Sequence, residues 1–168
     1  MPDPQHQTMT ATSDDGRGLG KTLRFMQKLW ALVHALDAKS KRMQRGIGIT
    51  GPQRLALRII GRHPGIAAGD LAALLCMHPS TLTGVLARLE DGEFIQRAPE
   101  PNERRRSRLT LTRRGRSRDG DRADTVEAAV RRALARCEPS VVEAGSKLLE
   151  TIVEELQDDA RVQPGNDD

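Results

Sequence analysis

Apolar side chains recur at every third or fourth position over residues 21–45, which is the spacing of one face of an α-helix. Thr50 then provides an N-cap residue for a short second helix. The same periodicity predicts a third helix over residues 69–75 and a fourth over residues 79–91, although Ala67 is a poor capping residue for the third. The first half of the chain is therefore expected to be helical.

Two short extended runs come after the fourth helix. The first, residues 94–98, is expected to stop at Pro99, and the second, residues 108–112, alternates polar and apolar positions as a half-buried strand does. The basic stretch between them, residues 100–107, predicts a loop. The two strands would thus form a hairpin with a cationic tip.

Two more helices are predicted after the hairpin. Thr112 is expected to cap a fifth helix that runs up to Cys137, and Ser140 opens a sixth with a continuous apolar stripe. Apolar periodicity is absent from residues 1–20, which predicts a flexible tail, and the acidic last residues are expected to fray. The predicted fold class is mainly α with a small β-hairpin wing.

Charge is unevenly placed along the 168 residues, whose formal net charge is +4. Residues 97–118 hold nine arginines and two glutamates, whereas residues 138–168 hold nine acidic residues. An arginine block of this kind suits a polyanion, because neutralised phosphates release condensed counterions, although a charged run is also typical of a solvated surface. The aromatic content of 2% argues against proteins that stack single-stranded bases on aromatic rings.

Other kinds of chemistry find little support in the sequence. Neither a secretion signal nor a long apolar stretch is recognisable, so we expect a cytoplasmic, nucleoid-associated protein without a membrane partner. Cys76 and Cys137 form no CxxC pair. Cys76 is interpreted as a small core residue and Cys137 as a residue at the dimer interface, with redox sensing as the alternative for both. We expect no metal, no cofactor and no enzymatic activity, since no ligand set, phosphate-binding glycine loop or nucleophile–base pair is recognisable.

Two short helices joined by a tight turn and followed by a β-hairpin are the order of a winged helix-turn-helix domain. A helix fits the major groove of DNA, where small polar side chains near its N-terminus reach base edges. On the fourth helix, this interpretation assigns base or phosphate contacts to Ser80, Thr81 and Thr83, a close approach to Gly84, and a phosphate contact to Arg88.

The hairpin supplies a second predicted contact with double-stranded DNA. Arginine is attracted into the minor groove by the negative potential there, which makes Arg104, Arg105 and Arg106 candidates. Glu103 lies two residues before Arg105, close enough to orient it through a charge-assisted hydrogen bond.

The alternative function is a winged-helix protein–protein interaction module without sequence-specific DNA binding.

At these residues the chain resembles the MarR family of bacterial transcriptional regulators. The resemblance is carried by Asp70-Leu71-Ala72, Pro79–Glu90, Phe94–Arg97 and Glu100–Gly115. The last segment is the most specific, because an acidic-Pro-x-acidic-Arg-Arg pattern is followed by Leu-Thr-x-x-Gly. This chain departs from the family at Glu103, where aspartate is usual, and at Gly84, where a longer side chain is common.

The resemblance implies a homodimeric, ligand-responsive repressor that binds a pseudo-palindromic operator and is released by a small aromatic or anionic ligand or by cysteine oxidation. Trp30 and His34, one turn apart on the first helix, are interpreted as core residues or, alternatively, as a wall of the ligand pocket. The predicted organisation comprises a tail (1–20), a dimerisation helix (21–48), a winged helix-turn-helix DNA-binding domain (49–115), dimerisation helices (116–160) and a frayed C-terminus (161–168).

Overall fold

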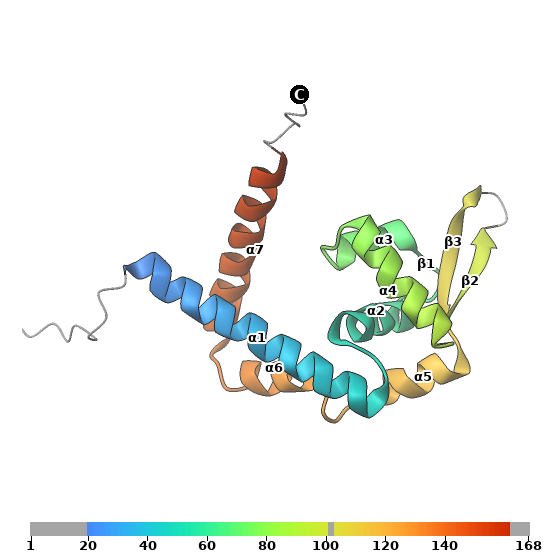
Figure 1. Cartoon of the computed structure of the whole chain (residues 1–168), viewed down its shortest axis with the longest axis horizontal. Helices are drawn as coiled ribbons and strands as arrows, with labels where there is room; N and C mark the ends of the chain where they lie inside the picture. The colour runs from blue at the N-terminus through green and yellow to red at the C-terminus, as the bar shows by residue number, and fades with distance from the viewer. Residues whose placement is uncertain (1–19, 101–102, 162–168) are drawn as a thin grey trace, which may run out of the picture.

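The structure is a computed structural model that describes residues 20–100 and 103–161, with the side chains of residues 99–106 and 158–161 outside the description. Its elements are, in order, α1 (Lys21–Ile47), α2 (Gly51–Arg62), β1 (Ile66–Ala67), α3 (Ala68–Leu74), α4 (Pro79–Asp91), β2 (Ile95–Glu100), β3 (Glu103–Leu111), α5 (Arg113–Gly120), α6 (Val126–Leu134) and α7 (Pro139–Arg161). Figure 1 shows α2, α3 and α4 beside a small sheet, from which a helical extension made of α1, α6 and α7 leads away. The mainly helical fold with a small β-hairpin is confirmed.

Strand β3 is the central strand of a three-stranded antiparallel sheet with the order β1-β3-β2. Ile66 of β1 pairs with Leu109 on one side of it, and Ile95 of β2 pairs with Leu111 on the other. Strand β1 was not predicted from the sequence, because two residues are too few to show alternation. Pairing with β3 also holds Ala67, which makes no side-chain capping bond at the start of α3.

The hairpin strands are longer than the sequence predicted. Strand β2 continues through Pro99, which pairs with Ser107, and the register shifts between Pro99 and Glu100. Proline has no backbone N–H to donate, but it is compatible with β2 because this is an edge strand, where one side of the backbone makes no hydrogen bonds to another strand of the sheet. The prediction of a long cationic loop is therefore wrong, since the backbone of residues 103–107 belongs to β3.

The single helix predicted from Thr112 to Cys137 is two helices in the structure. Thr112 caps α5 as expected, but α5 ends at Gly120. Asp124 then has a left-handed φ of 55°, and Thr125 caps α6. Glycine, aspartate and threonine are typical of a helix end followed by a new cap, a local signal that apolar spacing does not register.

The hydrophobic core lies between the short helices and the sheet. Its largest members are Ile49, Leu57, Ile60, Leu71, Leu75, Leu82, Leu86, Leu89, Phe94, Ile95, Leu109 and Leu111. Helix α4 has the predicted bounds and contributes three leucines of its predicted stripe, with Val85 packed against the core at its edge. Removal of this apolar surface from water is the main stabilising contribution, at roughly 25 cal/mol per Å².

No single helix among the described residues is long and apolar enough to cross a membrane. Helices α3 and α4 together reach the length and composition of a span, but they are bent by 112°. Their apolar content has a simpler cause, because Leu71, Leu82 and Leu86 are buried in the core.

We predict that Gly115→Ala destabilises the fold by at least about 2 kcal/mol, as overpacking against rigid backbone does. A Cβ atom at this position would lie 1.9 Å from the carbonyl oxygen of Phe94, which cannot move without disturbing the sheet. Urea unfolding followed by circular dichroism measures the loss. The matched control is Gly120→Ala, because nothing lies within 4 Å of a Cβ atom there. Equal stabilities of the two variants would contradict the prediction.

Candidate nucleic-acid interface and the cavity behind it

Helix α4 turns the predicted contact residues outward. Its buried side carries Leu82, Leu86 and Leu89, while the opposite side exposes Ser80, Thr81, Thr83, Gly84 and Arg88. A Cβ atom on Gly84 would meet nothing within 4 Å, so the helix surface is open there. The structure thus brings the predicted residues of this helix together on one exposed face.

Local hydrogen bonds restrict what the hydroxyl groups on this face can offer. His78 is the N-cap of α4; its Nδ1 lies 2.8 Å from Ser80 Oγ and accepts from the Ser80 amide at 3.4 Å. The Thr83 hydroxyl donates to the Pro79 carbonyl over 2.9 Å. Its oxygen lone pairs and its methyl group therefore remain available to a partner.

Strand β3 carries the predicted wing contacts. Glu103, Arg104, Arg105 and Arg106 lie on this strand, but their side chains fall outside the described residues, so the pairing of Glu103 with Arg105 stays a prediction. Nearer the core, Arg97 of β2 donates to Glu90 of α4 over 2.7 Å. This ion pair links the hairpin to the helix that carries the exposed polar face.

The start of α5 adds exposed cationic residues close to the hairpin. The guanidinium carbon of Arg114 lies 4.9 Å from the centre of the Phe94 ring, a cation–π distance. Arg114 also lies 3.6 Å from the carboxylate of Glu93, and both of these side chains are largely exposed. Such an exposed pair contributes little to stability.

A buried arginine that the sequence analysis did not single out joins α2 to the turn between α5 and α6. Arg54 is 1% exposed, and its Nε donates to Oε1 of Glu127 over 2.6 Å. Its Nη atoms donate to the backbone carbonyl oxygens of Arg118, of Asp119 at 3.4 Å and of Asp121 at 2.5 Å. Removing one member of such a buried charged network costs about 3–5 kcal/mol.

Arg58, one helical turn after Arg54, makes a second attachment at the end of α5, just before this turn. Its Nη1 donates to the Asp119 carboxylate over 2.7 Å and to the Asp119 carbonyl over 3.1 Å. The sequence signal was present, because Arg54 shares the buried face of α2 with Leu57, where an unpaired cation would be costly. Apolar periodicity does not register a basic residue on a buried face.

The acid–base behaviour of Glu127 follows from this contact. Partial burial raises the pKa of Glu127, but the hydrogen bond and the positive charge of Arg54, together with backbone and Thr125 hydrogen bonds, outweigh that effect and hold the pKa below its ordinary value of 4.5. The carboxylate is therefore ionised when it pairs with Arg54.

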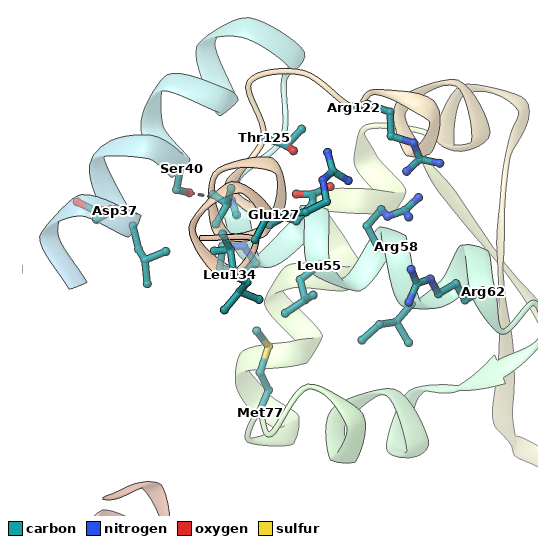
Figure 2. Close-up of a pocket in the computed structure, with 18 residues that line it drawn as sticks. Asp37, Ser40, Leu55, Arg58, Arg62, Met77, Arg122, Thr125, Glu127 and Leu134 are labelled. Atoms are coloured by element: carbon teal, nitrogen blue, oxygen red, sulfur yellow. Dashed lines mark hydrogen bonds between the residues drawn. The ribbon is translucent and has the colours of Figure 1, made fainter. Parts of the chain in front are cut away.

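A cavity of about 1020 Å³ lies between α1, α2 and α6. Figure 2 shows Arg58, Arg62 and Arg122 along one part of its wall, with Leu55, Leu134 and Met77 nearby. The complete lining comprises Leu36, Asp37, Ser40, Gly51, Pro52, Leu55, Arg58, Ile59, Arg62, Met77, Arg122, Thr125, Val126, Glu127, Val130, Arg131, Leu134 and Ala135. Apolar surface and guanidinium groups thus face the same space.

Trp30 and His34, predicted as core residues or as a pocket wall, do not line this cavity. Their ring centres are 6.5 Å apart, and Trp30 is 56% exposed. The core-packing interpretation is therefore wrong for the described chain by itself, because both Trp30 and His34 are exposed. The cavity begins further along α1, at Leu36.

Both cysteines are exposed. The interpretation of Cys76 as a core residue is wrong: it lies in the turn before α4 with a left-handed φ of 50°, and it is exposed. Cys137 follows α6, where its thiol lies 3.5 Å from the Ala133 carbonyl oxygen.

Large apolar side chains are exposed along the helical extension. On α1 they are Leu23, Phe25, Met26, Trp30, Leu32, Val33 and Leu36, and on α7 they are Val141, Leu148, Leu149, Val153 and Leu156. Exposed apolar surface of this extent is typical of an interaction surface.

Short helices packed on a three-stranded sheet, with a hairpin beside the second helix of the pair, define a winged helix-turn-helix protein. The same fold is found in Sco3205, a MarR family transcriptional regulator from Streptomyces coelicolor solved in complex with DNA, with a TM-score of 0.69, 22% identity and coverage of 86% of this chain and 93% of Sco3205. Residues 49–107 match the MarR family model, so this part of the chain is similar to that family.

Two relatives with assigned functions align with part of the chain. HTH-type transcriptional repressor Mb2911 of Mycobacterium bovis is 33% identical over 90 residues, which are 54% of this chain and 65% of the repressor. HTH-type transcriptional regulator TtmR of Methylorubrum extorquens is 28% identical over 118 residues, which are 70% of this chain and 60% of TtmR. The chain thus spans less than two thirds of the length of these relatives.

We predict that acid weakens the fold through Glu127. Because its folded pKa lies below the unfolded value, its contribution to the free energy of unfolding is complete above the unfolded pKa and is lost as the pH falls through the folded pKa. Urea unfolding from about pH 6 to about pH 3 measures this loss. Glu127→Gln, which cannot ionise, shows a shallower pH dependence than the wild type.

The control for this experiment is Glu143→Gln. Glu143 pairs with Lys147 over 2.9 Å on the exposed surface of α7, where an ion pair contributes little. If both variants followed the pH dependence of the wild type, Glu127 would have no special role in acid stability.

Proposed function

We propose that the protein is a sequence-specific, double-stranded-DNA-binding transcriptional regulator that acts as a homodimeric, ligand-responsive repressor in the cytoplasm. The observation that carries the proposal is the exposed polar face of α4. A helix with small polar residues and one arginine on its open side fits the major groove. The hairpin contacts α4 through β2, so both elements can approach the same duplex.

The known relatives support this reading. Mb2911 is a transcriptional repressor by name, and Sco3205 was solved in complex with DNA. The contacts proposed for this chain are Ser80, Thr81, Thr83, Gly84 and Arg88 on α4, and Arg104, Arg105 and Arg106 on β3, with Glu103 orienting Arg105. These are binding roles, and the proposed function requires no catalysis.

A second copy of the chain is the proposed partner of the helical extension. The apolar side chains of α1 and α7 are exposed in one chain, and association is the ordinary way to remove such surface from water. A twofold dimer would present two copies of α4 to a pseudo-palindromic operator.

The cavity supports the proposed ligand response. Arg58, Arg62 and Arg122 can bind an anionic group, while the apolar residues Leu55 and Leu134 can cover a hydrocarbon or aromatic portion. The proposed ligand class is therefore a small amphipathic anion, in agreement with the aromatic or anionic ligand expected from the sequence.

Binding to duplex DNA tests the function. We predict that the wild type binds an operator selected from a random duplex pool, and that Arg105→Ala weakens this binding by about 1–3 kcal/mol and lowers the salt slope by about 1. The physical reason is the loss of one guanidinium in the minor groove and of the counterions it releases. Fluorescence anisotropy at several salt concentrations measures both effects.

Arg136→Ala is the matched control, because Arg136 is exposed and follows the end of α6, a helix that Figure 1 shows apart from the hairpin. Equal binding by Arg105→Ala and wild type would remove the hairpin from the mechanism. A wild type that retards no duplex would refute the function itself and favour the protein-interaction alternative.

We predict that Leu149→Glu shifts the protein from dimer to monomer and raises the dimer dissociation constant at least about tenfold, since a carboxylate in an apolar interface is costly. Leu149 is 49% exposed in the single chain. Sedimentation velocity over a range of protein concentrations measures the change. Thr151→Glu adds the same charge away from the apolar stripe of α7 and should leave the dimer intact, whereas an undiminished Leu149→Glu dimer would exclude α7 from the interface.

A further inference from the structure

We infer that Arg54 is a positioning residue: it fixes the direction in which α6 and α7 leave the winged-helix region and thereby the separation of the two α4 helices in a dimer. This inference rests on the dimeric DNA-binding function proposed above. It assigns to one buried guanidinium a part in operator recognition, although Arg54 itself is too deeply buried to touch DNA.

The backbone that carries Arg54 is firmly held in the winged-helix region. Thr50 and Gln53 form a capping box at the start of α2, in which each side chain bonds the backbone of the other residue. Leu57 and Ile60, further along the same helix, are fully buried in the core. The guanidinium therefore extends from a fixed point on the side of the winged helix that faces the extension.

Arg54 binds the segment through which the chain leaves the winged-helix region. One side of the guanidinium binds carbonyl oxygens from the end of α5 and the following turn, and Nε binds Glu127 in the first turn of α6. The planar fork of an arginine has fixed donor directions. Its bonds to both helices consequently fix the angle between them.

A capping role alone does not account for this arrangement. The carbonyl groups at a helix end can be satisfied by water or by a following turn. Arg54 instead adds an ion pair with a residue beyond the turn, and Arg58 binds Asp119 from the next turn of α2. Two arginines of one helix thus hold the end of α5, and Arg54 also binds the five-residue turn that follows it and contains the left-handed Asp124.

Small changes at this turn have large effects at a distance. Helix α7 has 23 residues and is roughly 34 Å long. A rotation of about 5° moves the far end of a rod of this length by about 3 Å, which is close to the rise of one base pair, about 3.4 Å. A more flexible turn would therefore broaden the range of half-site spacings that a dimer can bind.

The distance between the two copies of α4 can be measured without DNA. Cys76 lies in the turn before α4 and is exposed, so it accepts a spin label, and Cys137→Ser removes the other exposed thiol. Double electron–electron resonance on this labelled parent should give a narrow distance distribution. Arg54→Lys keeps the charge but loses the fork, and it should broaden the distribution or shift it by about 3 Å or more.

Glu127→Gln is the second variant, and it keeps the inference testable if circular dichroism shows that Arg54→Lys does not fold. Glu127 is partly exposed, and its amide analogue keeps the shape of the side chain but weakens the Nε contact. It should change the distribution in the same direction by a smaller amount. Arg136→Lys, an exposed arginine-to-lysine change, is the matched control and should leave the distribution unchanged.

Operator spacing provides the functional readout. Duplexes carrying two copies of the selected half-site at centre-to-centre spacings of about 8 to about 13 base pairs should show one optimum near a helical turn for the parent. Arg54→Lys should lose about tenfold in affinity at that optimum and less than about twofold at neighbouring spacings. A purely structural loss of folded protein would lower binding at all spacings by the same factor.

The outcomes separate this inference from the proposed function. A monomeric parent, or one that binds no duplex, would refute the proposed function and the inference with it. A dimeric, DNA-binding parent whose distance distribution and spacing profile are unchanged in both Arg54→Lys and Glu127→Gln would overturn the inference alone.

Discussion

The pairing of β3 with strands on both of its sides is the constraint on which the winged-helix region depends. On one side, the Gly65 amide donates to the Leu109 carbonyl over 2.8 Å just before β1, and α3 begins directly after that strand. On the other side, β3 forms the hairpin with β2. At the end of β3 the Thr112 amide donates to the Phe94 carbonyl over 3.1 Å. Strand β3 thus fixes the positions of the α3–α4 pair, the hairpin and the start of α5 relative to one another.

The attachment of the helical extension has a different physical character. Where α5 leads into α6 it includes charged hydrogen bonds at Arg54 and Arg58, whereas the winged-helix region depends on apolar packing. Taking a guanidinium out of water is expensive, and its bonds recover that cost only in one geometry. Apolar contacts are non-directional by comparison. Arg54 therefore contributes a defined angle more than a large stabilisation.

The sequence predicted those parts of the fold that local signals determine. Helix α4 has its predicted bounds because Pro79 begins it, Gly92 follows it and its leucines share one stripe. The continuation of β2 through Pro99 was not predictable, because it depends on pairing with a strand that comes later in the chain.

The candidate site was predictable to a similar extent. The outward position of residues such as Ser80 and Thr83 follows from the buried stripe on the other side of α4. The Arg54 network could not be found by the same reasoning, because its partners lie more than sixty residues away and are mostly backbone carbonyls. The wing contacts around Arg105 stay predictions from the sequence pattern.

The two regions also differ in how complete they are as single chains. The winged-helix region encloses its own core, with side chains such as Leu57 and Leu109 fully buried. The extension leaves residues such as Trp30 and Leu156 more than half exposed, so its folding energy is incomplete until that surface is covered. The cavity lies between these regions, and Glu127 both lines it and accepts from Arg54. Any group that fills the cavity therefore meets Glu127, the ion-pair partner of Arg54, which we infer to set the angle between the α4 surface and the helical extension.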